Sequence, residues 1–173
     1  MENGLDQVLL HFSENVGIVS LMNTRWVWPI VESLHFLGLC LLIGAVGVFD
    51  FRMLGVGKSI PLATLHRFIP LGVAGYCLNV ATGTLFFLAA PDQYLYNPSF
   101  QMKMLFMAIA GSNMVIFYTT TAKTVKNTPA NQTVIYRAQV IGLVSLIAWT
   151  GVITCGRLLT FYRPPYHWCF WCS

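Results

Sequence analysis

The sequence predicts an all-α fold: a bundle of four transmembrane helices with up-down-up-down topology. Of its 173 residues, 56% are hydrophobic and 9% are charged, whereas soluble domains carry about 25% charged residues. Four segments each hold about 20 or more mostly apolar residues, enough to cross a hydrocarbon core about 30 Å thick. Short polar connections favour antiparallel packing of consecutive helices. We therefore expect a single transmembrane domain over residues 1–173.

The ends of the expected helices are marked by residues typical of helix ends and membrane interfaces. Trp26 and Trp28 open the first helix as interfacial aromatic residues. Pro91 ends the second helix, Ser99 is the expected N-cap of the third, and Pro164 ends the fourth. The expected spans are residues 26–49, 68–90, 100–120 and 138–161.

The segment before the first span, residues 5–22, predicts an amphipathic helix on the membrane surface or against the bundle. Its apolar side chains recur at helical spacing; they are Leu5, Val8, Leu9, Phe12, Val16 and Val19. Residues 1–14 lack the basic residues that begin a signal peptide. At the other end of the chain, residues 162–173 predict an aromatic tail that contains two cysteines.

The distribution of basic residues predicts that both termini lie outside the membrane. Six basic residues follow the first and third spans and share one side: Arg52, Lys58, Arg67, Lys123, Lys126 and Arg137. The other side has Arg25, Lys103, Arg157 and Arg163. The positive-inside rule places the larger group in the cytoplasm. The expected location is a bacterial inner membrane, with both termini in the periplasm.

The net charge of +4 is small and comes from loop residues, so it reflects topology and predicts no nucleic-acid binding. The expected partners are the lipid bilayer and either other membrane protein subunits or a second copy of the chain. Glycines are expected where helices approach closely. The candidate pairs are Gly44 with Gly47, Gly72 with Gly75, and Gly151 with Gly156.

Four ionisable residues lie within the spans: Glu32, His35, Lys103 and Arg157. A charge inside a bilayer is costly and is a candidate functional site by default. Glu32 and His35 share a helix face because they are three residues apart, and all four residues fall in the outer half of the bundle. A purely structural interpretation remains open, in which Glu32 pairs with Lys103 or Arg157 and holds helices together.

One functional interpretation is that His35 is an axial ligand of b-type haem. Arg157 and Lys103 would pair with the propionates, and Glu32 would orient His35 or share its proton. No second histidine lies well inside a span. The second axial ligand would then be Met107 or Met104, or a histidine that folds inward, His11 or His167.

Two other interpretations of these residues compete with haem. Glu32 and His35 match the Glu-x-x-His spacing of di-iron bundles, but those sites use two copies and two further glutamates. A proton path through Glu32 and His35 is the other, with polar atoms deeper in the spans from Tyr76, Asn79, Thr82 and Asn113. At the inner face, Asp50 is expected to form a clamp with Arg52 or Arg67, and His66 is expected to be solvated.

The C-terminal tail carries His167, Cys169 and Cys172. The two cysteines have C-x-x-C spacing and could form a disulfide, remain free thiols or, with His167, bind a metal ion. Three ligands are fewer than a closed zinc site uses. The cysteines within the spans, Cys40, Cys77 and Cys155, are expected to be small packing residues.

Two stretches, residues 28–38 and 49–55, resemble a family of uncharacterised four-span bacterial membrane proteins. The shared pattern is E-S-L-H-x-x-G followed by D-x-R-x-x-G, and residues 65–72 and 97–103 continue it. The resemblance implies the four-span fold and carries no activity. More distantly, the early histidine is similar to that of the copper-resistance D and membrane b-type cytochrome families, which implies haem or metal handling.

The sequence therefore predicts a small membrane subunit of a bacterial redox or electron-transfer assembly that holds b-type haem through His35. A non-catalytic accessory subunit that docks on a larger membrane complex is the alternative, and proton-coupled transport is a second. No arrangement of nucleophile, base and oxyanion donors is visible in the sequence. We therefore expect no independent catalytic activity.

Overall fold

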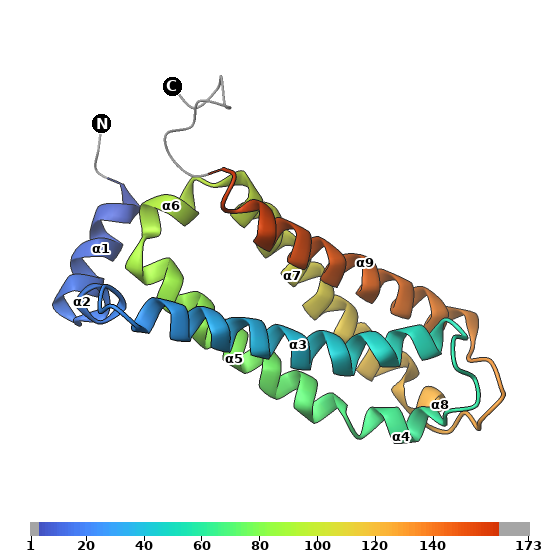
Figure 1. Ribbon diagram of the computed structural model, residues 1–173. Helices are drawn as coiled ribbons and strands as arrows, with labels where there is room; N and C mark the ends of the chain where they lie inside the picture. The colour runs from blue at the N-terminus through green and yellow to red at the C-terminus, as the bar shows by residue number, and fades with distance from the viewer. Residues whose placement is uncertain (1–3, 163–173) are drawn as a thin grey trace.

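The computed structural model describes residues 4–162, and this part of the chain consists of helices joined by turns and loops, with no strand. Four long helices form the bundle: α3 (Val27–Met53), α5 (Ile69–Ala89), α7 (Pro98–Ile116) and α9 (Tyr136–Leu158). Within the described residues, each lies in a helical segment long and apolar enough to cross a membrane. The predicted fold class is therefore confirmed (Figure 1). The last helix ends at Leu158, before the expected residue 161.

Short helices lie at the two ends of the bundle (Figure 1). They are α1 (Leu5–Asn15), α2 (Ile18–Met22), α4 (Leu62–His66), α6 (Pro91–Leu95), the π-helical turn η1 (Phe117–Thr121) and α8 (Ala122–Lys126). The end that carries α1, α2 and α6 is called the α6 end below. The opposite end, with α4, α8 and the two longer loops, is called the α4–α8 end. Both α3 and α7 run from the α6 end toward the α4–α8 end, and α5 and α9 return.

The bundle consists of two helical hairpins. In the first hairpin α3 packs along α5, and in the second α7 packs along α9. The hairpins meet mainly through α3 and α9. Figure 1 shows that they lie together at the α4–α8 end and diverge toward the α6 end.

Glycines set the close packing of α3 on α5. A Cβ atom on Gly75 would stand 2.5 Å from the Gly38 carbonyl oxygen, and one on Gly38 would stand 2.8 Å from the Gly75 oxygen. The two backbones therefore touch, a packing that membrane helices achieve with small residues. One turn away, a Cβ on Gly72 would stand 3.1 Å from the Ala45 Cβ. The expected contacts at Gly72 and Gly75 are confirmed, and their partner Gly38 was not foreseen.

Two further glycines fit the other helix contacts. A Cβ on Gly151 of α9 would lie 2.7 Å from the Phe106 ring of α7, and one on Gly142 would lie 3.2 Å from the Asp50 carbonyl oxygen of α3. The prediction of a helix contact at Gly44 is wrong, because no atom lies within 4 Å of the position of a Cβ there. Gly47 is also wrong, because it meets a side chain of its own helix alone.

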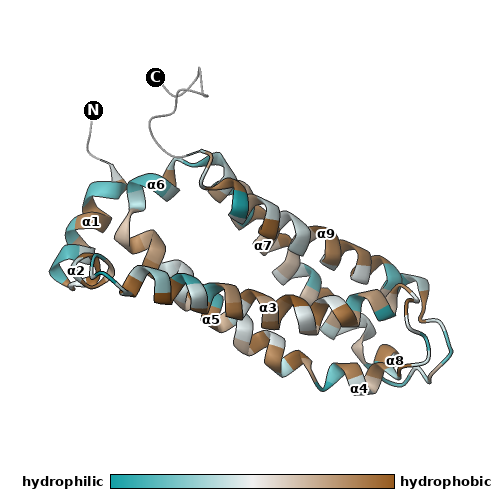
Figure 2. Cartoon of the chain, viewed as in Figure 1, coloured by the Kyte–Doolittle hydropathy of each residue, from teal (hydrophilic) through white to brown (hydrophobic). Residues whose placement is uncertain are grey.

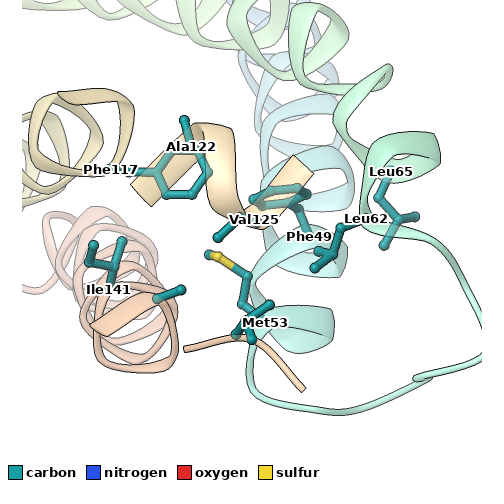
Figure 3. Packing of buried hydrophobic residues seen from close by; sticks show 10 residues of the cluster. Phe49, Met53, Leu62, Leu65, Phe117, Ala122, Val125 and Ile141 are labelled. Atoms are coloured by element: carbon teal, nitrogen blue, oxygen red, sulfur yellow. The ribbon is translucent and has the colours of Figure 1, made fainter. Parts of the chain in front are cut away.

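The apolar core is concentrated at the α4–α8 end. Side chains from α3, α4, α8, η1 and α9 converge there (Figure 3). The labelled members are Phe49, Met53, Leu62, Leu65, Phe117, Ala122, Val125 and Ile141. This cluster joins the two hairpins, and burial of its side chains contributes about 1.5–3 kcal/mol for each large residue.

Elsewhere the long helices consist mainly of apolar residues (Figure 2). Between 17% and 28% of the residues in the apolar part of each span are buried within the protein. Exposed large residues such as Phe36, Leu37, Val115 and Ile147 lie along the spans. In water such surfaces would associate, whereas a bilayer solvates them.

Asn97 joins the start of α7 to the end of α9. Its Oδ1 accepts a hydrogen bond from the backbone N–H of Ser99 at 3.0 Å. Its Nδ2 donates to the carbonyl oxygens of Leu159 and Tyr162 at 3.2 and 3.0 Å. The side chain is fully buried. The expected N-cap, Ser99, is therefore wrong: Asn97 caps α7 and also satisfies carbonyls left free beyond α9.

The N-terminal segment is helical as predicted, but it forms two helices in place of one. Gly17 lies between α1 and α2 with φ of +81°, a left-handed conformation that ends the first helix. The side of α1 that carries Leu9, Leu10 and Ser13 is the least exposed, and α1 packs on α5 and α6.

The two flanks of α1 differ in chemistry. One flank exposes apolar side chains, including Val8 and Phe12 at 71% and 55%. The opposite flank exposes Gln7, His11 and Glu14. At 100° per residue, these flanks lie on either side of the packed face. Such a helix suits the membrane interface, with one flank toward lipid and the other toward water.

The glycine contact between α3 and α5 predicts a difference between two alanine substitutions. Gly75→Ala should destabilise the protein by about 1–3 kcal/mol, because the methyl group meets the backbone of α3. Gly44→Ala should leave stability unchanged or raise it by up to about 1 kcal/mol, because it fills open space with a better helix former. Thermal unfolding of both detergent-purified variants measures the difference, and equal melting temperatures would contradict this packing.

Candidate functional site

His35 lies on α3 and faces α5, where it is half-buried. Its Nδ1 is 2.7 Å from the hydroxyl oxygen of Thr82 on α5. The Phe86 ring packs against the imidazole edge-on, with 5.9 Å between ring centres. A Cβ on Gly83 would stand 3.7 Å from the imidazole Cε1, so the ring rests against the backbone of α5.

The bonds of Thr82 decide which ring nitrogen of His35 carries the proton. The Thr82 hydroxyl donates its single proton within its own helix, to the Leu78 carbonyl oxygen at 2.7 Å, with the Asn79 oxygen at 3.3 Å. It therefore accepts from His35, which requires a proton on Nδ1. In the neutral imidazole, Nε2 then holds a lone pair. No residue within 4–162 forms a hydrogen bond with Nε2.

Lys103 is half-buried on α7 and is the charged residue of the second hairpin that acts electrostatically on His35. The Lys103 Nζ reaches toward α9, 3.8 Å from the position of a Cβ on Gly156, and interacts with Cys155. Gly156 therefore faces an ammonium group and not a crossing helix. Among residues 4–162, no carboxylate pairs with Lys103.

Glu32 and Arg157 do not join this group. Both side chains are exposed, and neither forms an ion pair within the described part of the chain. The expected ion pair of Glu32 with Lys103 or Arg157 is therefore absent there. Glu32 lies three residues before His35, on the neighbouring part of the helix surface. His35 faces α5, whereas the side chain of Glu32 points away from the bundle and is exposed. Met107 is half-buried on α7, one turn beyond Lys103.

The metal-binding interpretations receive no support from the described residues. Within residues 4–162, no group of three or more His, Cys, Asp or Glu side chains is placed to hold a metal ion. His11 is exposed on α1, where its Nδ1 lies 3.0 Å from the Asn15 amide nitrogen. His167, Cys169 and Cys172 lie outside the described residues. Cys40 and Cys77 are exposed and Cys155 is half-buried, all as free thiols.

The polar residues expected along a proton path are mostly engaged elsewhere. The Asn113 amide donates to the Ile141 carbonyl oxygen at 3.0 Å and joins α7 to α9. The Tyr76 ring packs edge-on against Trp149 of the second hairpin, 6.2 Å between centres. The Asn79 amide donates to its own helix at Gly75, and its Oδ1 is buried without a hydrogen-bond partner among residues 4–162.

At the α4–α8 end, Arg52 binds the two loops together. It is 1% exposed. Its Nε donates to the Ile60 carbonyl oxygen at 2.8 Å, and its Nη2 donates to those of Lys58 and Gln132 at 3.1 and 3.3 Å. The expected clamp of Asp50 with Arg52 or Arg67 is therefore wrong: Arg52 is committed to backbone carbonyls, and Arg67 is exposed. His66, expected to be solvated, is half-buried, 3.3 Å from the Tyr118 hydroxyl.

Asp50 itself is buried, at 3% exposed. Its Oδ2 has no hydrogen-bond partner among residues 4–162. The Ser145 side chain of α9 is the polar group that faces the carboxyl group. The sequence contained a signal for this site, an acidic residue in the last turn of an apolar span.

The fold and these contacts define the class: a multi-pass membrane protein with four candidate spans and polar groups buried along α3. Comparisons with protein-family models, with curated protein sequences and with solved structures gave no match. They therefore identify no family for the chain, and the resemblance to four-span bacterial proteins stays an expectation from the sequence motifs.

The burial of Arg52 predicts that its removal is costly. Arg52→Gln should destabilise the protein by on the order of 3 kcal/mol, because carbonyl oxygens of two loops lose their buried charged donor. Arg67→Gln removes an exposed charge from the same end and should change stability by no more than about 0.5 kcal/mol. Chemical unfolding in mixed micelles compares the two variants, and an equal effect would contradict the role of Arg52.

Proposed function

We propose that the protein is a small integral membrane subunit of a bacterial redox or electron-transfer assembly and that it binds b-type haem through the Nε2 atom of His35. The observation that carries the proposal is the hydrogen bond from His35 Nδ1–H to Thr82. An axial ligand must be a neutral imidazole with one bare nitrogen, and a hydrogen bond to the other nitrogen fixes its orientation. Thr82 supplies that bond.

Lys103 supports the same proposal from the second hairpin. It is a half-buried ammonium group whose charge acts on His35 and that has no carboxylate partner among the described residues. A haem propionate is a carboxylate, and pairing would offset the desolvation of both charges. Arg157, exposed in the last turn of α9, is the second candidate for a propionate. Bound haem would supply one-electron chemistry.

The described histidines leave the second axial position to another residue. His11 lies on α1 and His66 lies at the α4–α8 end, so neither shares the depth of His35. Met107 is the candidate within the spans, because it lies on the same face of α7 as Lys103. Glu32 is exposed on the adjacent turn of α3 and would act through solvent or a partner subunit.

The alternative function is that of an accessory subunit without a cofactor. It is supported by the large share of apolar side chains that the protein leaves exposed along its spans. Part of that surface would then contact a larger membrane complex in place of lipid. The two functions differ in one observable property, the colour of the purified protein.

The haem proposal predicts a redox-sensitive Soret band in the detergent-purified protein. The band should be lost in His35→Ala and retained in His66→Ala, the matched histidine variant at the other end of the bundle. Thr82→Val should weaken haem affinity about 10- to 100-fold, because it removes the partner that orients the ligand. Spectra are recorded for oxidised and dithionite-reduced protein.

A Soret band that survives in His35→Ala would move the ligand elsewhere. Protein expressed with ample haem that shows no band would exclude haem binding and favour the accessory subunit.

For location, we propose the bacterial inner membrane with the α6 end in the periplasm. Exposed basic residues gather at the α4–α8 end, which would be cytoplasmic; they are Lys58, Arg67, Lys123, Lys126 and Arg137. The α6 end exposes Arg25 and Arg157. Arg52 adds little to the difference in surface charge, because its guanidinium group is buried.

This orientation predicts the labelling of two single cysteines. In a variant with all five native cysteines replaced by serine, Asn23→Cys at the α6 end should react with a membrane-impermeant maleimide in intact cells. Ser59→Cys at the α4–α8 end should react after lysis alone. Both positions are exposed. The reverse pattern of labelling would invert the topology.

A further inference from the structure

Asp50 lies at the contact between the two hairpins, apart from the His35 site. It is 3% exposed, and its backbone carbonyl oxygen would stand 3.2 Å from a Cβ on Gly142 of α9. His35 is 15 residues earlier on α3, which is about 22 Å at 1.5 Å per residue. Asp50 is therefore a buried acid that haem binding at His35 would not use.

No positive charge among the described residues neutralises Asp50. Arg52, on the same helix, donates from Nε and Nη2 to three loop carbonyls. Its Nη1 has no partner among residues 4–162, so it makes no ion pair with Asp50. On α4, His66 contacts Tyr118 and the Phe49 ring. On α9, Arg137 is exposed at the first turn of the helix.

The remaining elements packed on α3 add no charge that faces Asp50. The titratable groups of α5 are Tyr76 and Cys77, both exposed, and α2 carries none. The polar group that faces Asp50 is the neutral hydroxyl of Ser145.

This environment suits a neutral carboxylic acid and not a carboxylate. An ionised carboxylate without a buried cation or sufficient donors carries a desolvation penalty of several kcal/mol. A protonated carboxyl needs one acceptor for its O–H, and the Ser145 oxygen can accept that bond. The buried Oδ2, which has no partner among residues 4–162, fits an atom that carries no charge.

We propose that Asp50 is a proton-binding site that controls the contact between the two hairpins. With the proton bound, the Asp50 carboxyl donates to Ser145 and remains buried between α3 and α9. When the proton leaves to water, an uncompensated negative charge remains in this contact and loosens it. Asp50 lies one turn from the end of α3, about 4.5 Å along the helix axis, so the proton exchanges at the α4–α8 end.

The proposal is independent of haem and adds a proton-dependent property to the protein. The hairpins already diverge toward the α6 end (Figure 1). A change at the Asp50 contact would alter their separation there, where His35 of the first hairpin and Lys103 of the second lie. Proton binding at one end would then act on the geometry of the site at the other.

The test compares thermal unfolding of the purified full-length protein from about pH 5 to about pH 9. In the unfolded chain water hydrates the ionised Asp50 carboxylate, whereas in the folded protein that charge would be buried without a cation. Stability of the wild type should therefore fall as pH rises across this range. Asp50→Asn should remove that part of the dependence, and Asp92→Asn, an exposed acid on α6, should retain it. An equal pH dependence in wild type and Asp50→Asn would overturn the proposal.

A second readout measures the hairpins themselves. Spin labels at Ser33→Cys on α3 and Thr154→Cys on α9, both exposed, report the distance between hairpins in the serine background. The distance distribution should broaden at high pH with Asp50 and stay constant with Asp50→Asn. A distance distribution that does not change with pH when Asp50 is present would overturn the proposal.

Infrared spectroscopy keeps the proposal testable if Asp50→Asn does not fold. Wild-type protein should show a protonated-carboxyl band at neutral pH, and this band should shift in Ser145→Ala. Absence of the band at neutral pH would overturn the proposal.

Discussion

The backbone contact between Gly38 of α3 and Gly75 of α5 is the constraint on which the rest of the structure depends. A Cβ on either residue would overlap the other helix, at 2.5 and 2.8 Å from a carbonyl oxygen. Because the helices touch, the His35 imidazole reaches the Thr82 hydroxyl directly, at 2.7 Å. In lipid, where apolar burial does not drive helices together, close packing and such hydrogen bonds supply the association. The same contact therefore stabilises the first hairpin and fixes the proton of His35.

Helix α3 also carries the contact with the second hairpin, and the two ends of the bundle differ as a result. At the α4–α8 end, an apolar cluster, the Arg52 hydrogen bonds and Asp50 join the hairpins and their loops. Toward the α6 end the hairpins diverge (Figure 1). A closely packed end and a more open end of one bundle give a physical basis for two separate sites, one proposed for haem and one for a proton.

The sequence predicted the elements of this fold better than their contacts. Span lengths followed from hydropathy and the end of α5 from Pro91. The contacts of Gly72 and Gly75 followed from residue size. The sequence did not predict that Gly38 is the partner of Gly75, because a glycine in a helix does not indicate which residue of the neighbouring helix it contacts. The predicted ion pair of Glu32 was wrong for a related reason. The spacing of three residues shows that Glu32 neighbours His35, but it does not show which side of the helix faces the bundle. Thr82 was noted only as a polar atom, since 47 residues separate it from His35.

The most direct test of the account is the tautomer of His35 in protein without haem. Nitrogen-15 NMR of histidine-labelled protein resolves the protonation of each ring nitrogen among the four histidines, and His35→Asn identifies the signal. The account predicts a neutral imidazole with the proton on Nδ1. In Thr82→Val, where the hydrogen-bond partner is lost, the Nδ1–H and Nε2–H tautomers should both be populated. A proton on Nε2 in the wild type, or a spectrum unchanged by Thr82→Val, would contradict the central claim that α5 prepares His35 as a ligand.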